Sequence, residues 1–242
     1  MTVIDELLVL LEDGQERTLD DCTTALDGRT RQTLSSTLGR LAGRGWVKVK
    51  TSRSSPPSTY VITDEGEAMV TQTLDQLRLV EAPHDGRWLF VLFNVPERQR
   101  KYRDILRNRL IQYGFGRIQN SLWVSARDVR FTFEDLLLDE RLQHHTTILR
   151  PTLSAEDAQH LVAAFEWEWK VLAAGYARFS ELAGRFLKQQ EQSSLGARLL
   201  VYRYAKLLSQ DPKLPEGLEP EGYDRKRAHA LYEKVRPFCY AA

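Results

Sequence analysis

Basic side chains in a stretch without acids are the most distinctive chemical feature of this sequence. From Gly28 through Thr63 there is no Asp or Glu, although the 242-residue chain has 33 of them. The same stretch carries Arg29, Arg31, Arg40, Arg44, Lys48, Lys50 and Arg53. Uncompensated Lys and Arg attract nucleic-acid phosphates. Because the net charge is only +1, the composition argues against indiscriminate coating of nucleic acid and favours a local, sequence-specific reader.

Catalytic and metal-binding patterns are not found in the sequence. Cys22 and Cys239 form no C-x-x-C motif or Cys/His cluster, so we expect two buried thiols and no zinc site or disulfide framework. His144 and His145, followed by Thr146, are typical of a strand edge. We therefore expect no metal, no cofactor, no catalytic residue and no enzyme activity.

The start of the chain and its apolar runs indicate where the protein works. The segment MTVIDELLVLLEDGQE carries acids where a secretory signal would carry bases. No run approaches the roughly 18 apolar residues that a membrane helix needs. We expect a cytoplasmic protein with no membrane partner.

A helix over 31–44 is expected to present these basic residues. Leu34, Leu38 and Leu41 have helical spacing and should face the core. The opposite face is small and polar, which suits insertion into the major groove of double-stranded DNA. We predict that DNA is contacted by Arg29, Arg31, Gln32, Ser35, Ser36, Arg40, Lys48 and Arg53.

The elements around this helix predict a winged helix-turn-helix domain over 1–80. Apolar spacing indicates helices over 3–11 and 19–26. Residues 46–50 and 59–63 alternate like strands and flank a turn rich in Ser and Pro, as in a two-stranded wing, and a helix follows over 64–79. The same fold also serves as a protein-interaction module. The missing acids favour DNA.

The middle segment, 85–151, has the pattern of a ferredoxin-like βαββαβ domain. An apolar run over 88–93 predicts a buried strand, and a basic amphipathic helix over 97–113 follows. Strand residues over 118–124, a helix over 129–138 and a strand over 146–149 complete the order. The arginines of the basic helix fit a DNA or anion contact and equally a solvated face offset by Glu97 and Asp104.

The remainder, 153–242, predicts an all-α domain, so the fold class of the whole chain is α+β. Helical patterns cover 154–190, 195–209 and 225–235, and the first has a broad aromatic and aliphatic face. Such a face is usually plain core. It also leaves open a ligand pocket.

The string RWLFVLFNVPERQRKYRDILRNRLIQYGFGRIQNSLWVS resembles the central domain of the PaaX family, repressors of phenylacetic-acid degradation. That domain is itself similar to the small ferredoxin-like subunit of the CRISPR adaptation machinery. GRLAGRGWVKVK, WEWKVLAAGYARF and YRYAKLLSQDPKLPEGLEP are also similar to PaaX proteins, in the same order.

The resemblance implies a homodimeric transcriptional regulator that represses a catabolic operon. Two-fold symmetry then predicts an operator that is an imperfect palindrome. The resemblance also implies release by an aryl-acyl-coenzyme A effector, with Trp167, Trp169, Tyr202 and Arg203 as the residues to watch for its pocket.

Two other classes of function stay open on the sequence. A metal-dependent nuclease or CRISPR-adaptation factor typically has an aspartate at the end of the first ferredoxin-like strand, where this chain has Asn94. A neutral amide does not supply the charge that a carboxylate offers to Mg²⁺. A structural adaptor would need no acid-free basic segment.

Overall fold

The computed structural model describes the chain except for residues 52–56, 79–83, 129–138, 166–168, 216 and 241–242. The described residues form an α+β structure with two antiparallel sheets, and the chain divides into two compact units. Unit 1 comprises Met1–Leu79, Ala177–Lys206 and Arg225–Ala242, and unit 2 comprises Val80–Tyr176 and Leu207–Asp224. The α+β fold class predicted from the sequence is confirmed. The division into domains 1–80, 85–151 and 153–242 stays a prediction.

The first helices of unit 1 start at capping boxes. α1 (Val3–Leu11) is preceded by Thr2, whose side chain accepts from the Asp5 backbone N–H while the Asp5 carboxylate accepts from the Thr2 backbone N–H. Thr18 and Asp21 make the same reciprocal bonds at α2 (Leu19–Ala25). Each box satisfies two backbone donors that a helix start otherwise leaves unpaired.

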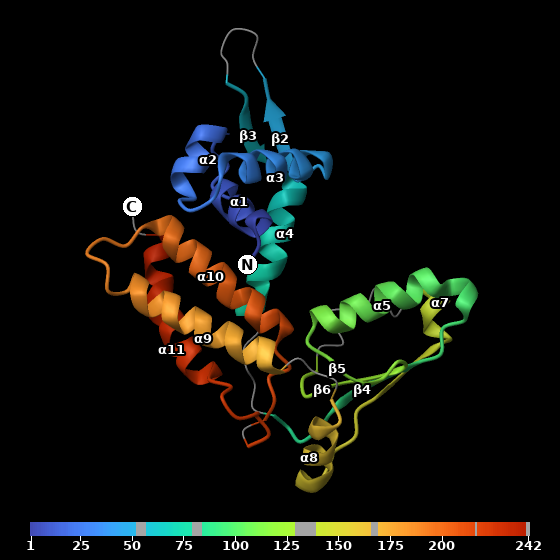
Figure 1. The fold of residues 1–242 in the computed structure, drawn as a ribbon. Helices are drawn as coiled ribbons and strands as arrows, with labels where there is room; N and C mark the ends of the chain where they lie inside the picture. Colours follow the sequence, from blue (N-terminus) through green and yellow to red (C-terminus); the bar gives the residue numbers. More distant parts are fainter. Residues whose placement is uncertain (52–56, 79–83, 129–138, 166–168, 216, 241–242) are drawn as a thin grey trace. The chain divides into compact units, whose positions relative to one another are not determined.

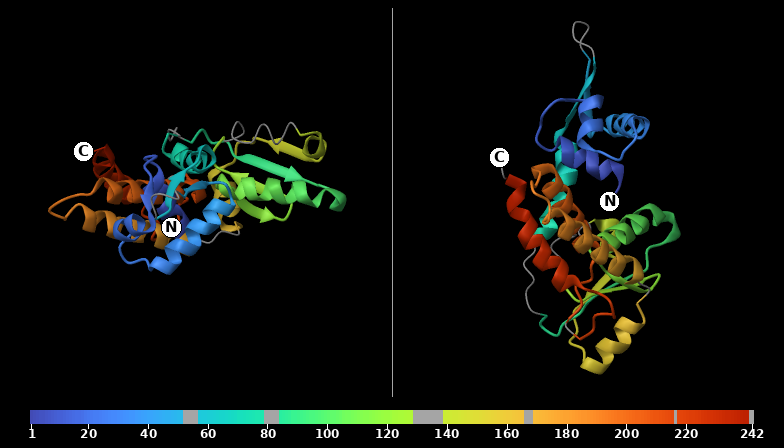
Figure 2. Two further views of the ribbon diagram at one scale, coloured as in Figure 1. Left: turned by 90° about the horizontal axis from the view of Figure 1, so that it is seen from above. Right: turned by 60° about the vertical axis from the view of Figure 1, so that its left-hand side comes forward.

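α3 (Arg31–Gly43) and a small sheet complete the N-terminal part of unit 1 (Figure 1). β2 (Val47–Lys50) pairs antiparallel with β3 (Thr59–Ile62), which also pairs with the short β1 (Arg17–Thr18). The right-hand view of Figure 2 also shows the paired strands projecting from the helices. α4 (Asp64–Leu74) and the 3₁₀ turn η1 (Asp75–Leu77) follow. This is the order of elements that the winged-helix prediction requires, with β1 as an addition.

Helices from the C-terminal part of the chain lie largely in unit 1, together with this N-terminal part. They are α9 (Trp169–Phe186), α10 (Ser194–Gln210), α11 (Arg225–Val235) and the 3₁₀ turn η4 (Arg236–Tyr240). Tyr202 of α10 joins the hydrophobic cluster formed by α1 and α3. Lys206 of α10 donates to both carboxylate oxygens of Asp5 at 2.7 and 2.9 Å. The sequence places these helices after the ferredoxin-like segment, but the fold returns their greater part to the N-terminal helices.

Unit 2 contains a four-stranded sheet in the order β5-β6-β4-β7. Its strands are β4 (Leu89–Phe93), β5 (Gly116–Gln119), β6 (Leu122–Ser125) and β7 (Thr146–Leu149). All neighbours are antiparallel. This order and pairing are those of the ferredoxin-like fold, as predicted. The helix predicted over 129–138 lies outside the described residues.

Helices cover both faces of this sheet (Figure 1). One face packs against α5 (Arg100–Gln112) and α7 (Glu140–Gln143) through Leu89, Val91, Leu106, Leu110 and Leu142. The 3₁₀ turn η2 (Glu97–Gln99) leads into α5. The other face packs against α8 (Ala155–Ala163) through Trp88 and Val124. β4 is central and buried on alternate sides, which explains its continuous apolar run.

The D-P-x-L-P segment after α10 packs against the end of α5. Asp211 is fully buried, and its carboxylate accepts hydrogen bonds from the Tyr176 hydroxyl and the Lys213 backbone N–H. A Cβ on Gly114, whose φ is +72°, would lie 2.7 Å from the Asp211 carbonyl oxygen. Glycine is therefore required both by the backbone conformation and by the close approach. The motif buries a carboxylate and ties two distant segments of unit 2 together.

Candidate nucleic-acid interface

α3 presents the surface that the sequence predicted for reading DNA. Leu34, Leu38 and Leu41 are fully buried. The opposite side is exposed and small or polar, and comprises Gln32, Ser35, Ser36, Gly39 and Arg40. Thr30 caps the helix by accepting a hydrogen bond from the Thr33 backbone N–H. A capped helix anchored by three leucines holds its polar face on a rigid support.

Three cations near this face have no acidic partner in the described part of the chain. The Arg40 guanidinium donates to the Thr37 hydroxyl at 2.9 Å, which keeps it on the exposed side of α3. The Arg44 guanidinium lies 5.1 Å from the centre of the Trp46 ring in a cation–π contact. Lys48 is exposed on β2. Uncompensated cations on a helix and the adjoining strand suit phosphate contacts.

Other predicted DNA contacts are engaged inside the protein. Arg29 makes a bidentate pair with Glu6 of α1, with hydrogen bonds of 2.7 and 2.8 Å, and these bonds raise the pKa of Arg29. Arg31 pairs with Asp20 of α2, and both side chains are exposed. Arg53 lies outside the described residues. All of these DNA assignments stay predictions, but the structure gives Arg29 a structural partner that the local sequence did not reveal.

Arg44 was missing from the predicted set of DNA contacts. The sequence Arg44-Gly-Trp46 at the end of α3 could have indicated this residue. A guanidinium stacks on an aromatic ring, and Trp46 lies only two residues after Arg44.

The residues considered for an effector pocket do not come together within one unit. Tyr202, 4% exposed, packs in the core of unit 1, and its hydroxyl lies 3.2 Å from the Thr73 hydroxyl. Arg203 is half-buried beside it, and burial, the largest influence, lowers its pKa. Trp169 belongs to unit 2, where it meets Tyr223 edge-on at 6.3 Å. Trp167 lies outside the described residues. The effector assignment stays a prediction.

The position considered for a nuclease metal site has little that would hold a cation. Asn94 is exposed just after β4, and its backbone N–H donates to the His145 carbonyl at 2.8 Å. Among the described residues, no three His, Cys, Asp or Glu side chains gather closely enough to bind a metal.

Two arginines of the basic helix α5 pair with acids of the same segment. Arg100 pairs with Glu97 and Asp104, and Arg103 pairs with Glu97 at 2.9 Å. Arg107 donates to the Asn120 carbonyl. Exposed pairs of this kind contribute little to stability, and the choice between a solvated face and an anion contact stays a prediction.

The two cysteines differ in burial. Cys22 is buried in unit 1, as predicted, and burial raises the pKa of its thiol to about 11. Cys239 is only partly buried, so the expectation of a buried thiol is wrong for this residue.

The fold defines an α+β protein that joins a helix-and-hairpin unit with an exposed basic helix to a ferredoxin-like sheet. Residues 81–163 match the PaaX protein central Cas2-like domain, and residues 164–242 match the PaaX-like protein C-terminal domain. The chain belongs to the PaaX family.

A solved structure described as uncharacterized protein Rv0674 from Mycobacterium tuberculosis has a similar fold. Its TM-score is 0.58 at 19% sequence identity, and the similarity covers 96% of this chain and 92% of that chain. No curated protein sequence matches this chain. None of the helices in the described ranges is long and apolar enough to cross a membrane.

Proposed function

We propose that this chain is a transcriptional regulator that binds double-stranded DNA through α3 and the β2–β3 hairpin of unit 1. Membership of the PaaX family, whose members are regulators, supports the general class. The observation that carries the proposal is the exposed face of α3, with its polar residues and with Arg40, which has no acidic partner in the described ranges. Gln32 and Arg40 are the side chains best suited to read base edges, and Ser35 and Ser36 are small enough for close approach.

The protein is further proposed to act as a cytoplasmic homodimer on an imperfect palindrome. Two copies of α3 related by a two-fold axis would meet matching half-sites in successive major grooves. Repression follows when the bound dimer occupies the promoter of a catabolic operon. Release by an aryl-acyl-coenzyme A ligand would require tighter ligand binding to a dimer geometry that fits DNA poorly.

Binding is tested by fluorescence anisotropy with DNA from upstream of the protein's own gene and with a shuffled control, over a salt series and with Mg²⁺ present. Arg40→Ala is expected to weaken binding to the native fragment about tenfold, because an arginine contact to a base or phosphate is lost. The matched control is Arg185→Ala, which removes the same charge from the exposed end of α9. It should leave the affinity unchanged.

Equal, weak binding to both fragments would contradict a specific regulator. Equal losses in the two variants would show that total charge matters and that α3 does not. Cleavage of the DNA in Mg²⁺ would favour the nuclease alternative.

A further inference from the structure

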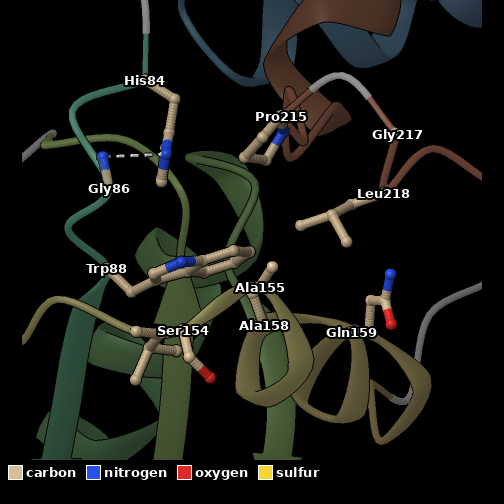
Figure 3. A pocket seen from close by; sticks show the side chains of 11 residues that line it. His84, Gly86, Trp88, Ser154, Ala155, Ala158, Gln159, Pro215, Gly217 and Leu218 are labelled. Atoms are coloured by element: carbon tan, nitrogen blue, oxygen red, sulfur yellow. Dashed lines mark hydrogen bonds between the residues drawn. The ribbon is translucent and has the colours of Figure 1, made fainter.

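The pocket in unit 2 is closed at the two side chains that could best bind a ligand. Its walls come from the approach to β4, the start of α8 and the segment after α10 (Figure 3). Trp88 is only 1% exposed, and the Nε2 atom of His84 is buried as well. An exposed polar group that the protein holds in place is found instead at the end of α3.

The turn between α3 and β2 is fixed by backbone hydrogen bonds. Gly45 has a φ of +76°; its N–H donates to the Ala42 carbonyl and the Trp46 N–H donates to the Leu41 carbonyl, both at 3.0 Å. This is the Schellman motif, which ends a helix at a glycine. The Thr63 hydroxyl donates to the Gly45 carbonyl at 2.6 Å, and the Thr63 N–H donates to the Trp46 carbonyl at 3.1 Å, which continues the pairing of β2 with β3. The turn is therefore held from both sides.

Trp46 provides a fixed support for Arg44. The tryptophan is partly buried and packs against the hydrophobic cluster formed by α1 and α3. The Arg44 guanidinium lies 5.1 Å from the centre of its ring, and Arg44 is exposed to solvent. A guanidinium that already rests on an aromatic ring loses less side-chain freedom when it meets an anion. The cation–π contact thus prepares Arg44 for binding.

The length of α3 separates Arg44 from the residues proposed to read bases. Gln32 and Arg44 are about 18 Å apart along the helix axis, at a rise of roughly 1.5 Å per residue. The major groove is only about 12 Å wide. A recognition helix contacts base edges with its N-terminal residues. Its other end, with Arg44, then extends toward the phosphates that border the groove.

Lys48 of β2 brings a second cation to the same side of the turn. Side chains alternate along an extended strand, so Trp46, Lys48 and Lys50 share one side. Lys50 pairs with Glu16, whereas Lys48 is exposed and has no acidic partner in the ranges that the structure describes. Arg44 and Lys48 therefore offer uncompensated positive charge to an anion approaching from that side.

We propose that Arg44 and Lys48 grip the phosphates of one DNA strand at the border of the major groove, and that Trp46 is the positioning residue that holds Arg44 for this contact. The inference rests on the proposed function, because it names the part of the DNA that the C-terminal end of α3 meets. It assigns affinity to Arg44 and base reading to Gln32 and Arg40.

Arg44→Ala tests the phosphate contact by fluorescence anisotropy over a salt series with the native and the shuffled fragment. Loss of one phosphate contact should weaken binding to both fragments by a similar factor, about three- to tenfold at low salt. It should also reduce the slope of log affinity against log salt concentration by about one. Arg40→Ala should weaken the native fragment more than the shuffled one. Arg185→Ala, the matched control on α9, should change neither the affinity nor the slope.

A double-mutant cycle tests the positioning role of Trp46. Trp46→Leu should weaken DNA binding about two- to threefold when Arg44 is present and should have no effect in the Arg44→Ala background. Trp46→Phe keeps an aromatic ring and should restore most of the loss. A merely structural role of Trp46 would instead lower the affinity equally in both backgrounds. Thermal unfolding shows whether each variant is folded at the temperature of the measurement.

The inference is overturned if Arg44→Ala leaves the salt slope unchanged, if it weakens the native fragment alone, or if Trp46→Leu has the same effect with and without Arg44. Failure of the proposed function has a different result, because the unaltered protein would then not distinguish the native from the shuffled fragment. An unaltered protein that prefers the native fragment, with an unchanged slope in Arg44→Ala, contradicts this inference alone. An unaltered protein that binds neither fragment contradicts both.

Discussion

At the residue scale, arginines that look alike in the sequence have different tasks. Arg29 reaches across to Glu6, whose side chain is only 10% exposed, whereas Arg31 and Asp20 form an ion pair in solvent. An arginine that pairs with a buried carboxylate contributes to the stability of the fold. An arginine in a solvent-exposed ion pair contributes little to it. Arg40 has no acidic partner among the residues described, and its role in DNA recognition is part of the proposed function.

Replacing Arg29 is expected to weaken the fold. Arg29→Ala should lower the free energy of unfolding by about 1–2 kcal/mol, because Glu6 is left with a largely buried charge; the figure is reduced for the 41% exposure of the Arg29 side chain. Arg31→Ala, the matched control, should change it by less than about 0.5 kcal/mol. Urea titration followed by circular dichroism measures both. Similar losses in the two variants would contradict the structural role assigned to Arg29.

At the element scale, α4 is held in place by a tight backbone contact and α1 by a partly buried ion pair. Gly66 of α4 lies under the Trp46 carbonyl, and a Cβ there would be only 2.2 Å from that oxygen. Asp5 of α1 is 6% exposed and pairs with Lys206 of α10, which is 201 positions later in the chain. These contacts fix α4 against the residue before β2 and α1 against α10.

Alanine substitutions at two helical glycines should have opposite effects. Gly66→Ala is expected to cost about 1–3 kcal/mol of stability, because the added methyl overlaps backbone that has to move. Gly184→Ala in α9 has no atom within 4 Å of the new Cβ and should stabilise by about 0.5–1 kcal/mol through helix propensity. Thermal unfolding of each variant measures the difference. A stabilising Gly66→Ala would show that the close approach is absent.

The Asp5–Lys206 pair should make stability depend on pH. Burial, the largest influence, raises the pKa of Asp5, but hydrogen bonds from Lys206 and Thr2 outweigh it and hold the pKa below the ordinary value of 3.8. The ionised carboxylate therefore stabilises the fold above about pH 4. This stabilisation is lost as pH falls through the lowered pKa.

Lys206→Met tests this contribution. At pH 7 the variant should be less stable by about 1–2 kcal/mol, a figure that allows for the partial exposure of Lys206. The deficit should shrink below pH 4, where Asp5 becomes protonated in the unfolded chain. Lys188→Met, at an exposed lysine just after α9, is the control and should follow the unaltered protein at every pH. A deficit of constant size across the range would mean that packing, and not charge, is what the substitution removes.

At the scale of the whole molecule, the proposed regulator depends on two copies presenting α3 to the same duplex. The half-sites must then be separated by whole turns of DNA, roughly 10 base pairs or a multiple of it. Insertion of half a turn of DNA rotates one half-site to the opposite side of the duplex. Insertion of a full turn returns both half-sites to the same side.

Spacer variants of the operator provide the corresponding prediction. Five added base pairs should reduce affinity by at least about tenfold, and ten should restore a large part of it, measured by anisotropy on otherwise identical fragments. The mass of the free protein by light scattering should be twice the 27.9 kDa of the chain. A monomer that binds every spacer variant equally would contradict the dimeric arrangement.

The sequence by itself determined the local elements, because helix spacing, strand alternation and capping residues act over short distances. The predicted helix over 3–11 and the predicted strand over 146–149 coincide with α1 and β7. The order of apolar segments also predicted the ferredoxin-like sheet. β1 was not predicted, since two residues carry no period and Arg17–Thr18 is a strand only by pairing with Tyr60 and Thr59.

Only the tertiary structure decided which distant residues meet. It placed Tyr202 in the core beside α1, gave Arg29 its partner Glu6, and closed the pocket of His84 and Trp88 with residues from beyond α10. The physical reason is that burial, ion pairs and pockets depend on separation in space, whereas periodicity reports only which face of its own element a residue occupies.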